Sequence, residues 1–296
     1  MFNRLMFWRK SSSLPQIGLF LGLDKAWVYV PQTANTPIRT EELDYQSNGW
    51  DSLFAQIADD FGHCELSIVL SPKLYQLLIA DKPAVEGDEL ASALLWSIKD
   101  MVSIPVHNIH LDYFESPITN SSKLQVVVAD KAMLSKLCAS AQDYKLTIAN
   151  IGVEELTLSN LFVSDKHAHM IVCLVPGQDL LLAVVREGAL YMQRHVRGFG
   201  ELYKMNAEQL SYGIADNLTL EMQRSMDYFE SLLHQSPVAS IELLMDGEVN
   251  ALAQLLTPNF NQPVNVIEKM SVETTLAMLA YSECTRAANV SEASDE

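Results

Sequence analysis

The sequence has no long hydrophobic run. Its longest apolar stretches reach about six residues, whereas a helix needs roughly 20 to cross a bilayer. The N-terminus carries Arg4, Arg9 and Lys10, but neither a long apolar stretch nor an A-x-A cleavage site follows, so we expect no secretory signal. These absences predict a cytoplasmic protein.

The sequence is also poor in positive charge and in cysteine. It has 20 Lys and Arg against 37 Asp and Glu, a net charge of −17, which argues against nucleic-acid binding because phosphates attract clustered cations. No C-x-x-C pair occurs, and we expect reduced thiols packed in or beside core elements rather than a disulfide framework. The four cysteines are Cys64, Cys138, Cys173 and Cys284.

Familiar catalytic motifs are missing. Neither G-x-x-x-x-G-K-[ST] nor G-x-G-x-x-G occurs, and Ser71 lacks the G-x-S-x-G context of a hydrolase nucleophile. His107 and His110, and His167 with His169, are close in sequence but have no neighbouring cysteine. We therefore predict surface or packed histidines, no metal site and no catalytic residues.

The stretch 64–117 has a distinctive order of elements. A short apolar strand at 66–70 is stopped by Ser71-Pro72, and a second strand is predicted at 74–80. A helix starting near Asp88 precedes Pro105, and alternation predicts a strand at 109–114. Trp96 lies off the apolar stripe of this helix, so it either serves a second surface or anchors the core. The stripe consists of Leu90, Leu94, Ile98 and Met101.

The remaining elements occur in a duplicated order: three strands, helix, strand, helix, strand, helix, twice. In the first half they are predicted at 17–23, 26–30, 37–43, 50–61, 66–70, 131–144, 146–151 and 154–163. In the second half they are predicted at 169–175, 179–186, 189–196, 207–234, 238–244, 248–256, 264–267 and 272–286.

Several phrases resemble one family. The segments around LSP, QLL and W-x-I-K-D, then VVREGALYMQRHVRG and LEMQRSMDYFESLLHQSPVASIELL, are similar to the PilM-like proteins of MSHA-type (MshI) type IV pilus assembly. The resemblance implies an α/β, actin-like (ribonuclease-H-like duplicated) two-lobed fold with an inserted subdomain. It further implies a non-catalytic cytoplasmic adaptor at the inner membrane that docks the tail of a PilN-like partner, and through it a PilO-like protein.

The expected organisation follows from the element order and this resemblance. A basic, aromatic leader occupies 1–15, and its residues 1–13 could contact an anionic membrane surface. The first lobe spans 16–163 with an insert at about 72–129, and the second lobe spans 164–288. An acidic tail at 289–296 is predicted to be disordered. The resemblance places partner docking on the first lobe and its insert, and Trp96, off the apolar stripe of its helix, is our candidate for contact with the partner.

Actin-like proteins that use ATP hold its phosphates between two hairpins, where small residues and a carboxylate are needed. The first hairpin, LGLDKAWVYV, keeps Gly22 and Asp24 but continues with Lys25, Ala26 and Trp27 where active relatives have small or hydroxyl residues. Lys25 could still meet a phosphate as a point charge.

The second hairpin and the adenosine turn depart further from the active pattern. IVCLVPGQDLLLAVV has Cys173 and Leu174 where an acid is expected, and Gly177 with Asp179 forms either a slipped substitute or a plain hairpin turn. LLMDGEVNAL has only Gly247 where two or three glycines are expected. We expect vestigial sites and no cofactor, with weak ATP and Mg²⁺ binding, or a nucleotide-gated ATPase, as the alternative.

Overall fold

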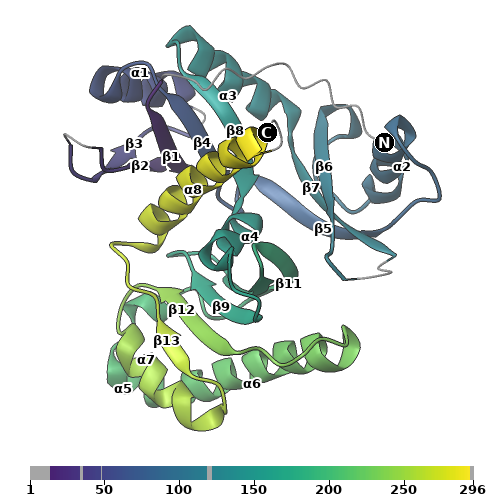
Figure 1. The fold of residues 1–296 in the computed structure, drawn as a ribbon, viewed down its shortest axis with the longest axis vertical. Coiled ribbons are helices and arrows are strands. Elements are labelled where there is room, and N and C mark those ends of the chain that lie inside the picture. Colours follow the sequence, from purple (N-terminus) through teal and green to yellow (C-terminus); the bar gives the residue numbers. More distant parts are fainter. Residues whose placement is uncertain (1–13, 34–35, 48, 119–121, 294–296) are drawn as a thin grey trace.

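The computed structural model describes residues 14–33, 36–47, 49–118 and 122–293, which form two lobes and a smaller inserted module (Figure 1). The predicted membrane-contacting leader at 1–13 lies outside the described residues. Within the described ranges, no helix is long and apolar enough to cross a membrane.

The first lobe is built on a five-stranded sheet in the order β3-β2-β1-β4-β8. Successive side chains of the central strand β1 point to opposite faces of the sheet, and both faces are buried. Ile17, Leu19 and Leu21 enter the core beneath α1 and α3, whereas Phe20 points into the core between the lobes. The elements are β1 (Gln16–Leu21), β2 (Lys25–Val30), β3 (Arg39–Asp44), α1 (Trp50–Phe61), β4 (Glu65–Leu70), α3 (Lys131–Asp143) and β8 (Thr147–Val153).

The second lobe repeats this plan with the order β11-β10-β9-β12-β13. In both sheets the first three strands pair antiparallel and the last two add in parallel. The elements are β9 (His169–Leu174), β10 (Leu180–Arg186), β11 (Ala189–Val196), η3 (Leu202–Lys204), α5 (Ala207–Ser211), α6 (Ile214–Asp227), η4 (Tyr228–Leu232), β12 (Ser240–Met245), α7 (Val249–Leu256), η5 (Thr257–Asn259) and β13 (Val264–Val266).

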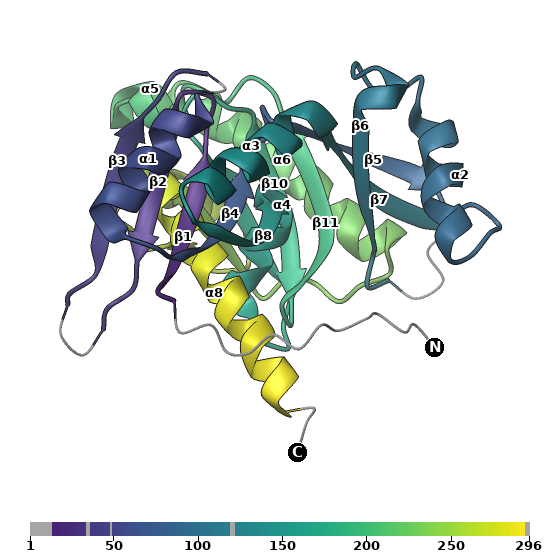
Figure 2. The ribbon, with the colours of Figure 1, turned by 90° about the horizontal axis from the view of Figure 1, so that it is seen from above.

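The insert is an antiparallel sheet in the order β5-β7-β6 with α2 on its outer face (Figure 2). Leu94 and Ile98 of α2 pack on Val126 and Val128 of β7 to form its own small core. The elements are β5 (Tyr75–Asp81), α2 (Asp88–Ile98), η1 (Val106–Asn108), β6 (Ile109–Glu115) and β7 (Lys123–Asp130). The helix ends at Ile98, so Met101 lies beyond it and is exposed rather than on a buried stripe.

Each lobe's sheet is contacted by helical residues from the other half of the chain. The last helix, α8 (Val272–Ala293), crosses the first lobe's sheet over β1, β2 and β4, whereas α4 (Glu154–Thr157) and η2 (Leu158–Phe162) contact β11 and β10 of the second lobe (Figure 1). A Cβ on Gly18 would lie 1.9 Å from the carbonyl oxygen of Ala277, so α8 is seated directly on the backbone of β1.

Three predicted boundaries change in the structure. The predicted helix 207–234 is divided into α5, α6 and the π-helical turn η4, because Tyr212 leaves the helix and Gly213 takes φ +87°. The predicted helix 154–163 is one α-helical turn followed by the 3₁₀ helix η2. Helix α8 continues to Ala293, so the first part of the tail expected at 289–296 is helical.

Candidate functional site

Glu155 is a fully buried carboxylate at the point where the insert, the connecting helix and the second lobe meet. The hydroxyl of Tyr75 in β5 donates to Oε2 over 2.5 Å, and Nε2 of His195 in β11 lies 2.9 Å from Oε1. Strand β8 runs without a loop into α4, which places Glu155 at the strand end facing both neighbours. Both of its oxygens are therefore satisfied, each from a different part of the fold.

Glu154 is adjacent to Glu155, but its carboxyl oxygens have fewer hydrogen-bond partners. Its Oε1 accepts only from the Cys173 thiol, 3.6 Å away, and Oε2 has no hydrogen-bond partner among the described residues. Burial, together with the charge of Glu155, raises the pKa of Glu154 to about 8. This carboxyl therefore holds its proton at neutral pH. We call Tyr75, Glu154, Glu155 and His195 the Glu155 junction.

The other members of the Glu155 junction are shifted by the same surroundings. Burial alone would lower the pKa of His195, but its hydrogen bond to Glu155 and the charge of that carboxylate outweigh burial and raise the pKa. Burial and the charge of Glu155 raise the pKa of Tyr75 well above its usual value, so the phenol remains a donor. Burial, reinforced by Glu154, does the same for the Cys173 thiol. Neither the phenol nor the thiol is poised to lose its proton near neutral pH.

A cavity of about 400 Å³ opens beside the Glu155 junction. It lies between the start of the insert and the β9–β10 turn of the second lobe, and the side chain of Gln178 donates to Oγ of Ser71 across the lobes over 2.9 Å. Its lining consists of Pro72, Lys73, Tyr75, Leu77, Glu155, Gly177, Gln178, Asp179 and His195.

The first vestigial phosphate position, at Gly22, Asp24 and Lys25, is internally paired. Lys25 forms ion pairs on its own sheet with Glu42 and, over 3.5 Å, with Asp44. The amide of Gly22 closes the hairpin on the carbonyl of Lys25 over 2.8 Å. Lys25 thus already has two carboxylate partners.

The other two positions differ from each other. Gly177, at φ +74°, and Asp179 line the 400 Å³ cavity, and Asp179 lies 3.8 Å from Arg197. Gly247, at φ +87°, packs against the second lobe itself, because a Cβ there would lie 2.4 Å from the carbonyl oxygen of Tyr203. Lys25 lines a separate cavity of about 480 Å³ beside the first turn of α8. The predicted nucleotide residues are therefore divided between two cavities and a packed turn.

Trp96 lies on the outer surface of the insert. Its side chain is 66% exposed and the Lys99 ammonium lies 4.6 Å from the ring centroid. The alternative that Trp96 anchors the core is therefore wrong. Among the cysteines, Cys64 and Cys173 are buried as expected, but Cys138 is exposed on α3 rather than packed.

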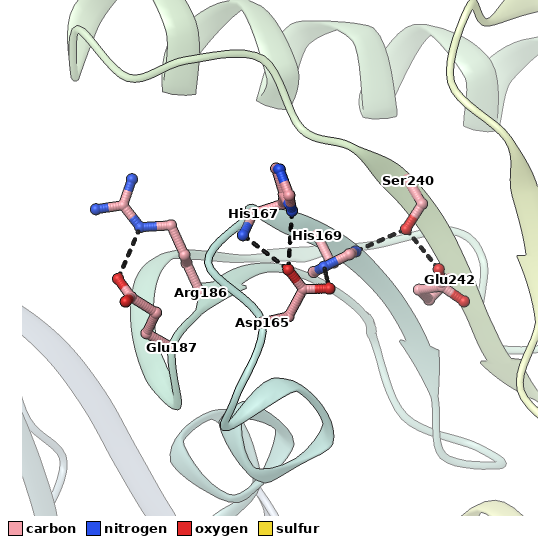
Figure 3. A network of polar contacts seen from close by, with 7 residues as sticks. All are labelled: Asp165, His167, His169, Arg186, Glu187, Ser240 and Glu242. Atoms are coloured by element: carbon pink, nitrogen blue, oxygen red, sulfur yellow. Dashed lines mark hydrogen bonds and ion pairs between the residues drawn. The ribbon is translucent and has the colours of Figure 1, made fainter.

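The two histidine pairs behave differently. His107 and His110 are exposed on the insert. His169 is buried and fixes the segment that crosses between the lobes, because its ring stacks on Phe162 with 3.9 Å between centroids. Its Nε2 also lies 3.0 Å from Oδ2 of Asp165 (Figure 3). Among the described residues, no group of three His, Cys, Asp or Glu side chains has a metal-binding arrangement.

The polar contacts of His169 continue into the second lobe's sheet. Nδ1 lies 2.7 Å from Oγ of Ser240, and that hydroxyl donates to Glu242 over 2.5 Å (Figure 3). Since Asp165 also accepts from the backbone and side chain of His167, its pKa is lowered to about 2. The network serves to hold the crossover segment on the second lobe.

Sequence reasoning missed the Glu155 junction. The available signal was the pair Glu154-Glu155 at the start of the helix predicted at 154–163, shortly after the strand predicted at 146–151, and ordinary helix-start rules assign such a pair to a solvated first turn. Tyr75 and His195 gave no signal, because each sits in a strand pattern that packing alone explains. Only the tertiary arrangement brings them together.

Comparison with known proteins supports the fold. No protein-family model and no curated protein sequence matches this chain. The solved PilM–PilN type IV pilus biogenesis complex contains a chain 13% identical, with a TM-score of 0.67 over 92% of this chain and 99% of that one. The cytoplasmic domain of EpsL, an inner-membrane component of the Vibrio cholerae type II secretion system, is 12% identical with a TM-score of 0.54 over 90% and 94%.

A third similar structure is a Bacteroides thetaiotaomicron protein of unknown function described as having an actin-like ATPase fold. It is 11% identical, with a TM-score of 0.52 over 89% of this chain and 95% of that one. Likeness at these identities establishes architecture alone. Together with the duplicated sheets and exchanged closing helices, it shows that the chain has the actin-like two-lobed fold.

Proposed function

We propose that this protein is a non-catalytic cytoplasmic adaptor of a type IV pilus assembly platform, docking the cytoplasmic tail of a PilN-like inner-membrane protein. The carrying observation is the insert, a module outside the duplicated plan that exposes large apolar side chains. It belongs to a chain of which 92% is similar in fold to a chain in the solved PilM–PilN complex. The phrases that resemble MshI assign it to the MSHA-type system, peripheral to the inner membrane.

The insert has the surface that peptide docking needs. Exposed apolar side chains beside free strand edges are typical of peptide-binding surfaces. Trp96, Met101 and Ile79 are 66%, 55% and 53% exposed. Strands β5 and β6 form the two edges of the insert's sheet. A tail can therefore add backbone hydrogen bonds to apolar contacts.

The charge of the chain favours a basic or neutral tail over an acidic one, because a net charge of −17 repels anions at low ionic strength. A PilN-like protein would in turn connect the adaptor to a PilO-like protein. Contact of residues 1–13 with anionic lipid would add a second attachment to the membrane, and this part of the proposal rests on composition alone.

The non-catalytic part of the proposal is supported by the phosphate positions. The Lys25 ammonium already forms ion pairs with Glu42 and Asp44, and the Gly247 turn packs against the carbonyl of Tyr203. Active nucleotide sites need free cations and open glycine turns facing one cavity. The vestigial residues here do not share one.

Trp96→Ala tests the docking surface. Titration of the purified protein with a synthetic PilN-like cytoplasmic tail, followed by calorimetry, should show binding that falls at least about tenfold in this variant, as expected for loss of an interface aromatic. Tyr212→Ala is the matched control, since Tyr212 is a 74% exposed aromatic on the second lobe. Equal binding by all three proteins would remove Trp96 from the surface.

Point substitutions are better probes than removal of the insert. Tyr75, Leu77, Val127 and Ala129 of the insert's strands pack into the first lobe's core. Deleting it would expose that core. Melting curves recorded beside the titration separate lost docking from lost folding.

A nucleotide-gated ATPase is the second candidate function. The observation that favours it is the Gly177 turn, which has a positive φ, faces the 400 Å³ cavity and has open space where a Cβ would stand. Calorimetric titration with Mg-ATP decides between the two. Binding and turnover that Asp24→Ala abolishes would favour the ATPase, and an absence of heat would favour the adaptor.

A further inference from the structure

Three parts of the chain that are far apart in sequence meet at Glu155. Tyr75 belongs to the insert, Glu155 to the connecting helix and His195 to the second lobe. Both carboxylate oxygens are used, one by each neighbour, over 2.5 and 2.9 Å. Because a buried carboxylate that loses a donor is strongly destabilised, Glu155 contributes a polar contact that couples the position of the insert to the second lobe.

Glu154 makes that arrangement sensitive to protons. It is only 2% exposed, and Oε2 has no partner among the described residues. Titratable groups face it from five elements: Glu155 on α4, Tyr75 on β5, Cys173 on β9, His195 on β11 and Glu273 on α8. Loss of its proton places a second negative charge beside Glu155 with one cation nearby to balance both.

His195 is the cation in question. It faces Glu155, Glu154 and Asp179, and Tyr75 faces the same two glutamates. Lys73 also lines the adjacent cavity. When His195 becomes neutral, its contact with Glu155 loses the charge-assisted part of the hydrogen bond.

We propose that the Glu155 junction is a proton-controlled switch. With a proton on Glu154, Glu155 holds Tyr75 and His195 together and the insert is fixed on the second lobe. When that proton leaves, the junction loosens and the insert moves relative to the second lobe. The switch is a property of the isolated protein and stands apart from the docking function proposed above.

Loss of the proton from Glu154 and loss of the proton from His195 both weaken the Glu155 junction. The raised pKa of Glu154, about 8, means that a proton bound at neutral pH is lost as the solution becomes alkaline, and the raised pKa of His195 moves the loss of its proton in the same direction, to higher pH. The junction is therefore closed at neutral pH and open in the alkaline range. Glu273, whose pKa burial also raises, adds to the same trend from α8.

The fold leaves room for this movement. The 400 Å³ cavity lies between Leu77 of the insert and the Gly177–Asp179 turn of the second lobe. Apolar contacts remain elsewhere, since Phe114 packs on the core between the lobes and Ile118 on the second lobe's core. Opening is thus a shift of the insert about these contacts rather than its detachment.

Hydrogen-exchange mass spectrometry on the full chain at pH 6.5 and 8.5, corrected for intrinsic exchange, tests the switch. Wild-type β5 and β11 should lose about tenfold or more of their protection at the higher pH, as one unit of pKa linkage implies. Glu154→Gln, which has no proton to lose, should keep its protection at both values. Unchanged wild-type protection, or an equal loss in Glu154→Gln, would overturn the proposal.

A second pair of variants separates the switch from general destabilisation. His195→Gln should show low protection of β5 at both pH values, because the carboxylate has lost its cation. His167→Gln is the matched control, since His167 is exposed and outside the junction, and it should behave as wild type. Loss of β5 protection in His167→Gln to the same extent as in His195→Gln would also overturn the proposal.

Discussion

Glu154→Gln should stabilise the protein, although it replaces a buried native residue. In the folded chain burial raises the pKa of Glu154 from 4.5 to about 8, so between these values the unfolded chain releases a proton that the folded chain keeps. The unfolded state thus binds fewer protons, and the free energy of unfolding falls as pH rises. Glutamine has no proton to release, so the variant escapes this loss.

The size of this loss in the free energy of unfolding follows from the pH interval between the two pKa values of Glu154. At about 1.4 kcal/mol per pH unit, the loss accumulated between pH 4.5 and pH 7 is about 3 kcal/mol, with the full effect reached near pH 8. A chain of this size changes its melting temperature by roughly 2 °C per kcal/mol. We expect Glu154→Gln to melt about 6 °C above wild type at pH 7 and at the same temperature near pH 4.5.

Melting followed by circular dichroism across pH 4.5 to 8.5 measures this directly. Glu65→Gln is the matched control: Glu65 is also buried, but it accepts from the Gln16 amide over 3.2 Å and lies outside the junction. That variant removes a buried carboxylate at another place and shows whether the gain is specific to Glu154. A Glu154→Gln protein that melts no higher than wild type at pH 7, or keeps the wild-type slope with pH, would refute the reasoning.

Three further substitutions follow from single contacts. Tyr75→Phe removes the donor to Glu155 and should lower the free energy of unfolding by about 1–3 kcal/mol, measured by urea titration. Gly18→Ala places a Cβ 1.9 Å from the carbonyl oxygen of Ala277 and should cost about 3 kcal/mol or more by lifting α8, visible as a lower melting temperature. Trp96→Ala, at an exposed site, should change the free energy of unfolding by less than about 0.5 kcal/mol in the same titration.

The fold could be predicted largely from local patterns. Strands of four to eight apolar residues bounded by turns, and helices with one apolar stripe, have short-range signatures, so their duplicated order is readable. The insert interrupts that order once and was found for the same reason. The α5–α6 break was missed because apolar spacing continues through Tyr212 and Gly213, and only the positive φ of the glycine ends the first helix.

The sequence could not show that α8 packs on the first lobe's sheet while α4 and η2 contact the second lobe. The stripe on α8 shows that the helix is buried, but not which sheet buries it, and Gly18 acquires its meaning only when Ala277 arrives from the other end of the chain. Trp96 was undecided for a related reason. Its position off the apolar stripe left both a second surface and a core anchor open, and only the structure, in which the side chain is exposed, decides between them.

The Glu155 junction escaped prediction for a deeper physical reason. Two adjacent glutamates in a first helical turn are favourable when solvated, and nothing nearby in the sequence indicates burial. An apolar pair of similar volume at that place would be at least as stable, since buried charges repay their desolvation poorly. Stability therefore does not explain Glu154, whose Oε2 is left unpaired among the described residues.

Two kinds of contact hold the lobes and the insert together, and they respond differently to conditions. The apolar core between the lobes, which includes Phe20, Leu158 and Leu276, is indifferent to pH. The Glu155 junction is polar, buried and coupled to a proton. A molecule that kept only the apolar contacts would have one arrangement of insert and second lobe. In the switch proposed above, the proton-coupled polar contact beside them gives the insert a second arrangement relative to the second lobe, and two arrangements of similar free energy are what a conformational switch requires.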